Sequence, residues 1–251
     1  MLGFCEICPH SGGEKDCLYP KRRLGATEKI TVELKSLQQQ RLLSTIANKE
    51  QIVHIQKGWA YSFRMSESGG RLVGGVYCEG DLLSTASFFT SGFDESARAL
   101  SDMEVCVINA AEFLKVVRLR DDYFIYLRKM TSRLLWLLSN QCYDLSNRPP
   151  EERLCRAFIV SSLKLYGEIR TTNELFPVTQ EVLADQIGVS KIHVNRMLVK
   201  LQKDGICHLR HGMMIVLDGE RLRQKAGITE TELDAWKQVL GVENQGSGLS
   251  I

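Results

Sequence analysis

The sequence "LADQIGVSKIHVNRMLVKLQKDGI", residues 183–206, contains two short helical patterns that a glycine separates. We predict a first helix with Thr179 as its N-cap that ends near Ile187, because Gly188 can supply the following turn. A second helix is expected over residues 190–203. The apolar residues that would pack the two helices together are Leu183, Ile187, Val194, Leu198 and Leu201. The segment therefore predicts a helix-turn-helix.

Two short strand-like runs follow this segment. They read "ICHLRH" and "MMIVLD", and they flank the dipeptide His211-Gly212. A pair of strands directly after a helix-turn-helix is the pattern of a winged helix, which places its second helix in the major groove of DNA.

The start of the predicted second helix carries side chains that can reach base edges. These are Ser190, Lys191, His193, Asn195 and Arg196. Arg196 can donate two hydrogen bonds to a guanine, and Lys191 can reach a guanine or a phosphate. Thr179 and Gln180, at the N-terminus of the first helix, suit contacts with phosphate. A winged helix used only for protein contact is the alternative, but this clustering of donors favours double-stranded DNA as the partner.

The composition is that of a folded protein with one large or two ordinary domains. The chain has 251 residues, of which 44% are hydrophobic and 25% charged. No apolar run is long enough for a bilayer, and the first residues lack the pattern of a secretory signal. We expect a cytoplasmic protein with no membrane partner. The sequence shows no Ser/His/Asp cluster, phosphate loop or zinc-hydrolase motif, so we expect no enzyme.

Residues 42–114 alternate short apolar runs with Gly, Ser and Asn. One of these runs, "IVHIQKGWAYSFRM", contains Lys57-Gly58 as a turn. Closely spaced short strands of this kind predict a small β barrel or sandwich.

Residues 121–147 contain neither Gly nor Pro and predict one long helix. An a/d-type seam at spacings of three, four and three comprises Leu127, Met130, Leu134 and Leu137. The seam predicts pairing with a second helix in a dimer, with burial inside one subunit as the alternative because the seam is short. A second apolar face comprises Phe124, Ile125, Trp136 and Leu138. One face can pack on the barrel and the other on a partner helix, so we expect a homodimer. The dipeptide Pro149-Pro150 then starts another helix that runs to about Tyr166.

With these motifs the chain resembles the Crp–Fnr superfamily of bacterial transcription regulators. The resemblance implies an α+β fold with an N-terminal β-roll sensor domain, a long dimerisation helix and a C-terminal winged helix-turn-helix. It also implies an operator in double-stranded DNA and RNA polymerase as partners. The expected division is residues 1–20 as a Cys-rich segment, 21–118 as the β roll, 119–147 as the dimerisation helix, 148–230 as the DNA-binding domain and 231–251 as a tail.

The recognition helix departs from that family at one position. The family usually places an acidic residue one turn before its arginine, and here that position is Ile192. Isoleucine cannot accept a hydrogen bond from a cytosine amino group, although it can touch a thymine methyl.

The N-terminal cysteines Cys5, Cys8 and Cys17 are close together in the sequence. In a cytoplasmic protein such a cluster more often binds a metal or senses redox state than forms disulfides. The resemblance to the oxygen-sensing Fnr branch implies a [4Fe–4S] cluster with these three and Cys106 as ligands. Zinc held with His10 is an alternative, and a set of free thiols without any cofactor is another. The remaining cysteines, Cys142, Cys155 and Cys207, are interpreted as packing residues, with Cys78 as a reserve internal ligand.

A regulator without a cluster stays open as an alternative function. On the same scaffold, haem with a bound gas, a small organic effector or thiol oxidation can supply the signal.

Overall fold

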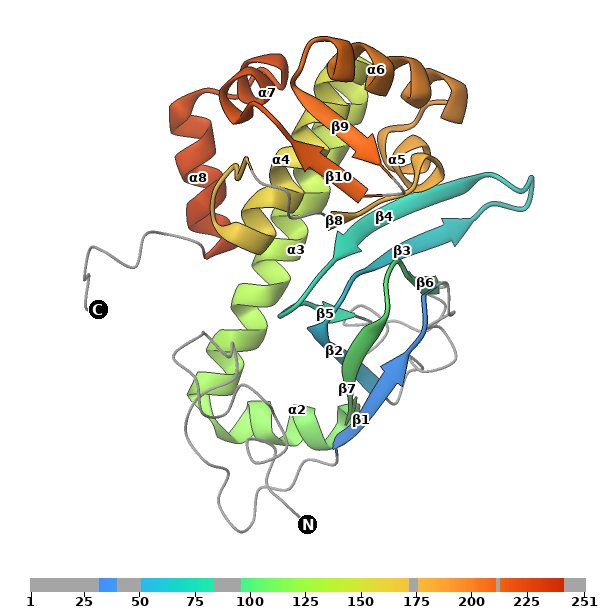
Figure 1. The fold of residues 1–251 in the computed structure, drawn as a ribbon. Helices are drawn as coiled ribbons and strands as arrows, with labels where there is room; N and C mark the ends of the chain where they lie inside the picture. Colours follow the sequence, from blue (N-terminus) through green and yellow to red (C-terminus); the bar gives the residue numbers. More distant parts are fainter. Residues whose placement is uncertain (1–31, 40–50, 84–95, 172–175, 211–212, 242–251) are drawn as a thin grey trace. The chain divides into compact units, whose positions relative to one another are not determined.

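The computed structural model describes residues 32–39, 51–83, 96–171, 176–210 and 213–241 (Figure 1). The chain divides into two compact units. The first takes in Met1–Arg64 and Val76–Leu135, and the second takes in Met65–Gly75 and Trp136–Ile251.

The first unit is built on antiparallel strands. One sheet has the order β1-β7-β2-β5, with β1 at Val32–Leu37, β2 at Gln51–Lys57, β5 at Leu82–Leu83 and β7 at Met103–Asn109. A second sheet has the order β4-β3-β6, with β3 at Ala60–Met65, β4 at Arg71–Tyr77 and β6 at Ser96–Ala99. Most of β4 is assigned to the second unit, because that unit takes in Met65–Gly75. The predicted β-rich N-terminal domain of an α+β protein is confirmed.

Strand β7 separates two apolar clusters because its side chains alternate between the faces of the sheet. Val105 and Val107 belong to one cluster, with Val53 of β2. Cys106 belongs to the other, which also contains Phe113. The alternation therefore places the Cys106 thiol on the apolar face opposite the two valines.

The turn between β2 and β3 requires glycine, as the sequence predicts. Gly58 has a φ of 94°, a region that side-chain-bearing residues rarely adopt. A Cβ atom at this position would lie 2.4 Å from the carbonyl oxygen of Asp102. Any other residue would clash there with backbone, so Gly58 fixes the path of the chain from β2 in one sheet to β3 in the other.

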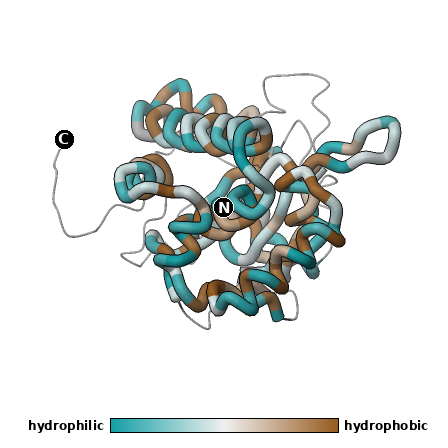
Figure 2. The backbone as a smooth tube through the Cα atoms, turned by 90° about the horizontal axis from the view of Figure 1, so that it is seen from above, coloured by the Kyte–Doolittle hydropathy of each residue, from teal (hydrophilic) through white to brown (hydrophobic). Residues whose placement is uncertain are grey.

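Two helices follow β7 in the chain. Helix α2 spans Ala110–Leu119, and the side chain of its N-cap Asn109 accepts a hydrogen bond from the Glu112 N–H at 3.0 Å. Helix α3 spans Asp121–Asn147 without a break, which confirms the predicted long helix. Hydrophilic and hydrophobic residues alternate along the helices, as expected when one face of each packs inward (Figure 2).

The apolar seam of α3 lies against its own chain, which differs from the expected dimer contact. Leu127 and Met130 pack on the cluster that contains Cys106. Leu134 packs on the cluster that contains Val105. A repeat of apolar residues on a helix indicates that one face is buried, but the repeat does not say whether the same chain or a partner covers it.

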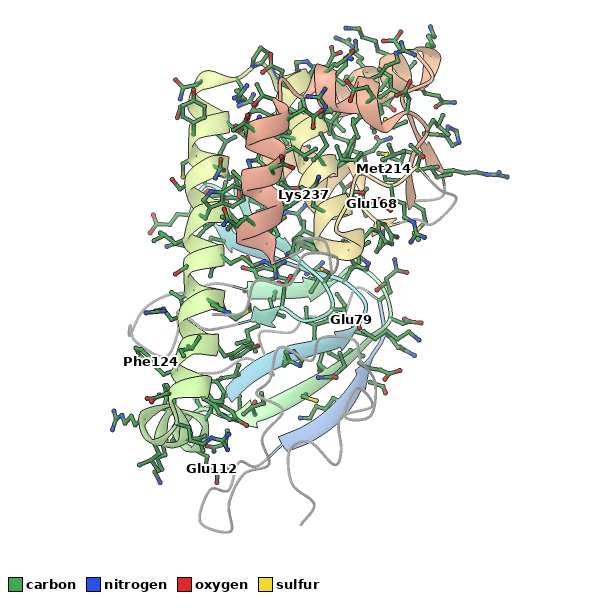
Figure 3. All side chains as sticks on the ribbon, turned by 90° about the vertical axis from the view of Figure 1, so that its left-hand side faces the viewer. Glu79, Glu112, Phe124, Glu168, Met214 and Lys237 are labelled. Carbon is green, nitrogen blue, oxygen red and sulfur yellow. The ribbon has the colours of Figure 1, made fainter. Side chains whose placement is uncertain are left out.

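The outward face of α3 carries a different set of apolar residues. Phe124 is 52% exposed, Ile125 42%, Leu135 68% and Leu138 38%. Figure 3 shows Phe124 projecting from α3 on the side away from the strands. Leu134 and Leu135 are neighbours in sequence, so they point about 100° apart around the helix.

The second unit contains the predicted winged helix. Its helices are α4 at Pro150–Tyr166, α5 at Gln180–Ile187, α6 at Lys191–Lys203, α7 at Gly219–Lys225 and α8 at Glu230–Leu240. Its strands are β8 at Phe176–Pro177, β9 at Cys207–Arg210 and β10 at Met213–Val216. Helix α4 begins at Pro150 and is capped by Gly167 in the left-handed conformation, so both predicted ends are confirmed.

Residues 230–240 form helix α8, whereas the sequence predicts a tail over residues 231–251. Thr229 caps α8 by accepting a hydrogen bond from the Glu232 N–H at 3.1 Å. Leu233, Trp236 and Leu240 are buried. The spacings of three and four place these residues on one face, so the helix forms because that face packs on its own unit.

Candidate DNA-binding surface

The helix-turn-helix is held together by local caps and a small apolar core. The Thr179 hydroxyl accepts from the Val182 N–H at 3.1 Å, and the Ser190 hydroxyl accepts from the His193 N–H at 3.3 Å. Gly188, with a φ of 67°, makes the turn between α5 and α6. The buried residues of the two helices are Val182, Leu183, Ala184, Ile187, Val194, Met197, Leu198 and Leu201. The predicted helices and the predicted packing are both confirmed.

The side chains predicted to read bases are all exposed. They are Ser190, Lys191, His193, Asn195 and Arg196. Thr179 and Gln180 are half-buried at the start of α5. A shallow groove of about 330 Å³ on α6 is lined by Ser190, Ile192, His193, Arg196, Met197 and Lys200. The start of α6 therefore offers donors, a cationic side chain and an apolar side chain on one open surface.

The structure links the start of α5 to this surface. The side-chain amide of Gln180 donates to Asn195 Oδ1 at 3.2 Å. The sequence predicts the two residues as separate contacts, one with phosphate and one with a base. Their hydrogen bond instead orients both amides, so a change at either residue also affects the other.

Lys191 forms an ion pair with Glu181 of α5, for which the sequence carries no local signal. Its Nζ lies 2.7 Å from Glu181 Oε1, and both side chains are more than half exposed. The hydrogen bond from Lys191 lowers the pKa of the Glu181 carboxyl. Since exposed ion pairs contribute about 0–1 kcal/mol, Lys191 can leave Glu181 for a phosphate at little cost.

The far end of α6 is anchored to the surrounding helices by charges. Glu151 of α4 lies 2.7 Å from Lys200 Nζ and 3.0 Å from Lys225 Nζ. Partial burial raises the pKa of Glu151, but the hydrogen bonds from Lys200 and Lys225 outweigh it, so this pKa lies below its usual value. Lys225 also lies 3.3 Å from Asp204, directly after α6. These contacts link the end of α6 to α4 and α7.

The wing has three strands, where the sequence predicts two. Strands β9 and β10 pair antiparallel, with Met213 opposite Arg210. Strand β8 pairs with the other edge of β10, with Met213 opposite Pro177. The predicted turn residues His211 and Gly212 lie outside the described residues. A two-residue strand has no periodicity of its own, so the sequence offers no signal for β8.

A buried arginine connects the helices beneath the helix-turn-helix. Arg156 of α4 is 2% exposed, and its guanidinium lies 2.9 Å from Asp144 and 2.5 Å from Glu232. The same group lies 4.6 Å from the centre of the Trp236 ring. Burial raises the pKa of the Asp144 carboxyl, against the opposing effect of Arg156. Arg156 therefore ties the end of α3 and the start of α8 to α4.

The segment Met65–Gly75 belongs to the same unit as the helix-turn-helix. Arg71 Nε donates to Asp185 of α5 at 2.5 Å. The side-chain amide of Gln141 donates to the carbonyl oxygens of Val73 at 2.9 Å and Gln186 at 3.3 Å. These contacts join residues 45 to 114 positions apart, a separation at which sequence patterns carry no signal.

One of the four predicted cluster ligands lies in the described part of the chain. Cys106 is 3% exposed and sits on β7 opposite His54 of β2. Cys5, Cys8 and Cys17 lie outside the described residues, as does His10. Within the described ranges, no group of three or more His, Cys, Asp or Glu side chains is placed to hold a metal ion.

The other cysteines have distinct surroundings. Cys78 is buried in the turn before β5, where its N–H donates to Asp81 Oδ2 at 2.9 Å. Burial raises the pKa of the Cys155 and Cys207 thiols to about 12 each. Cys155 and Cys207 are buried, which agrees with their interpretation as packing residues. Cys142 is exposed on α3, so the same interpretation is wrong for Cys142.

Comparisons with known proteins agree with this geometry. Residues 152–225 match the family model described as a Crp-like helix-turn-helix domain. Electron transport regulator A of Shewanella oneidensis is 23% identical over 182 residues, which cover 69% of this chain and 70% of that protein. The transcriptional activatory protein AadR of Rhodopseudomonas palustris is 25% identical over 177 residues, with the same shares.

Solved structures share the fold. FixK2 from Bradyrhizobium japonicum superposes with a TM-score of 0.65 at 17% identity, over 77% of this chain and 96% of that one. TTHB099, a CRP-family transcriptional regulator from Thermus thermophilus, gives 0.61 at 13% identity over the same shares. No helix among the described residues is both long and apolar enough to cross a bilayer. Residues 152–225 thus carry a Crp-like helix-turn-helix domain, and the chain is similar over about two thirds of its length to transcription regulators of the Crp/Fnr type.

Proposed function

We propose that this regulator binds its operator as a homodimer and responds to oxygen or redox state through an N-terminal [4Fe–4S] cluster. The observation that carries the DNA-binding part is the exposed polar start of α6, with Arg196 and its neighbours on one open surface. A cytoplasmic location and a contact with RNA polymerase belong to the same proposal.

Each polar residue of this surface has a role set by its chemistry. Arg196 donates to a guanine edge in the major groove, because its planar guanidinium matches the two acceptors of that base. Ser190, His193 and Asn195 approach neighbouring bases. Thr179, Gln180 and Lys191 hold phosphates and so fix the register of α6 without reading sequence.

The outward face of α3 is the proposed dimer contact. Phe124, Leu135 and Leu138 follow spacings of eleven and three residues, which keep them in one stripe of a helix. These side chains are 38% to 68% exposed, whereas Leu127, Met130 and Leu134 already pack within the chain. A second copy of α3 would cover the exposed stripe, as two helices do in a short coiled coil.

Cys106 fits the proposed cluster as a single thiolate ligand. Its sulfur is soft and lies in an apolar setting formed by Ile52, Phe113 and their neighbours, which limits access of water to a bound iron. Cys5, Cys8 and Cys17 would supply the other three ligands. When bound, such a cluster supplies a centre that oxygen destroys. Without the cluster, Cys106 would be a free thiol in the apolar cluster that also contains Tyr123 and Tyr126 of α3. A relative named as an electron transport regulator supports a redox signal.

The test is anaerobic purification of the full chain with assays for iron and sulfide, followed by exposure to air. We expect a brown protein with about four iron atoms per chain, and we expect air to bleach it and weaken operator binding together. A Soret band would point to haem. A colourless protein without iron would leave zinc, an organic effector or free thiols as the signal.

A further inference from the structure

Ile192 is a large apolar side chain that is 67% exposed in the first turn of α6. It makes no contribution to the core of the helix-turn-helix, which uses Val194, Leu198 and Leu201 instead. A β-branched residue is also a weaker helix former than alanine. Neither packing nor helix propensity accounts for isoleucine at this position.

Ile192 shares one face of α6 with the proposed guanine reader. Arg196 follows four residues later and Val199 seven residues later, so the three lie in one row along the helix. The core residues Val194 and Leu198 point to the other side. Ile192 also lines the same shallow groove as Arg196. When α6 lies in the major groove with Arg196 bound to a guanine, Ile192 therefore faces a base of the neighbouring base pair.

The chemistry of Ile192 selects among bases. It has no donor or acceptor, so it cannot pair with the polar edge of adenine, guanine or cytosine. The C5 methyl group of thymine is the one apolar group in the major groove. A β-branched side chain in a helix is already nearly fixed in one rotamer, so little entropy is lost on contact.

We propose that Ile192 is a specificity-determining residue that contacts the methyl group of a thymine in the base pair next to the one read by Arg196. The inference rests on the proposed function, since it requires that α6 enters the major groove. It predicts an operator half-site with two neighbouring base pairs, of which one contains the guanine that Arg196 reads and the next contains a thymine.

The experiment removes the methyl group alone. Binding sites are first selected from a pool of random DNA duplexes with the full-length wild-type protein. Each thymine of the selected site is then replaced in turn by uracil, which has the same hydrogen-bonding edge without the methyl. We expect one uracil per half-site to weaken binding about fourfold, the effect of burying one methyl-sized group, and the other uracils to have no effect.

Matched variants on α6 assign that effect to a side chain. Ile192→Ala should bind the thymine and uracil duplexes equally. Val199→Ala, which shortens another exposed apolar residue of the same face, should keep the fourfold ratio. Circular dichroism verifies that both variants are folded, which exposure of 67% and 44% at the two sites leads us to expect.

Two results separate the possible failures. If a site is selected but every uracil is tolerated, or if Ile192→Ala retains the discrimination, the assignment of Ile192 is wrong while DNA binding stands. If no sequence is enriched from the pool by aerobic or anaerobic protein, the proposed function itself fails, and the inference fails with it.

Discussion

Arg156 Nε donates to Asp144 across 2.9 Å, and only 2% of the arginine side chain is exposed. The guanidinium also contacts Glu232 in the first turn of α8, so one buried cation holds carboxylates from α3 and α8. Arg156→Met preserves much of the volume but leaves the half-buried Asp144 with Arg148, at 3.2 Å, as its remaining ion-pair partner. We expect the free energy of unfolding to fall by about 1.5–3 kcal/mol, the contribution of a hydrogen bond to a charged group, measured by urea denaturation. Glu232→Gln should cost clearly less, because Glu232 is partly exposed. Equal stability of Arg156→Met and wild type would contradict this account.

Arg196→Ala tests the recognition helix. Loss of a two-bond contact with guanine should weaken binding to the preferred site by about 1–3 kcal/mol and flatten discrimination at one base pair per half-site. Lys203→Ala removes an exposed charge at the other end of α6 and is the control, with base preference unchanged. A quantitative footprint reads both effects. If the Arg196→Ala protein kept an unaltered sequence preference, Arg196 would not be a base-contacting residue.

Leu134 and Leu135 are neighbouring leucines of α3 at which the same substitution should have different effects. Leu135 is 68% exposed, whereas Leu134 packs on the core of the first unit. Leu135→Asp should yield folded monomers, because the charge would be buried only in the dimer. Leu134→Asp should destabilise the first unit itself. Light scattering combined with thermal unfolding distinguishes the two. A dimeric Leu135→Asp protein would place the interface elsewhere.

Cys106→Ser and Cys78→Ser test the internal cluster ligand. Both thiols are buried, at 3% and 1% exposure, so the two changes perturb similar surroundings. We expect Cys106→Ser to lose most iron and its absorbance in anaerobic preparations, and Cys78→Ser to retain them. The opposite outcome would assign the fourth ligand to Cys78. Replacement of Cys5, Cys8 or Cys17 by Ser should match Cys106→Ser.

The buried thiols predict a loss of stability at alkaline pH. The pKa values of Cys155 and Cys207 are raised to about 12 in the folded protein, while an unfolded thiol titrates near 8.5. Between about pH 9 and 11 the unfolded chain therefore loses protons that the folded chain keeps. Each thiol should lower the free energy of unfolding by about 1.4 kcal/mol per pH unit in that range. The double variant Cys155→Ala/Cys207→Ala should show a shallower slope, and an identical slope would contradict the assignment.

The sequence predicts the helix-turn-helix because its signals are local. Thr179 and Gly188 each act within four residues, and both cap α5 as expected. The sequence pattern leaves both a partner helix and burial within the same chain open for the α3 seam, because a repeat of apolar residues does not identify what covers it. In the structure, Leu127, Met130 and Leu134 pack on two apolar clusters of their own chain, so the chain itself covers this part of the seam.

Sequence patterns do not predict contacts between residues that are far apart in the chain. Arg156 and Glu232 are 76 positions apart, and Arg71 and Asp185 are 114 apart. Single charged residues at such separations have many possible partners, and only the fold selects among them. The same limit applies to the pairing of β8 with β10.

The edge-to-face contact between Trp136 and Trp236 also gives the protein a built-in optical signal. Their ring centres are 5.6 Å apart at an interplanar angle of 85°, and the third tryptophan of the chain is Trp59 in the other unit. Two indoles at that distance couple electronically, so the near-ultraviolet circular dichroism of the folded chain contains a contribution from this pair. Release of α8 from its unit would remove that contribution while leaving Trp59 in place. Spectra of the unlabelled protein can therefore follow the last helix separately from the first unit.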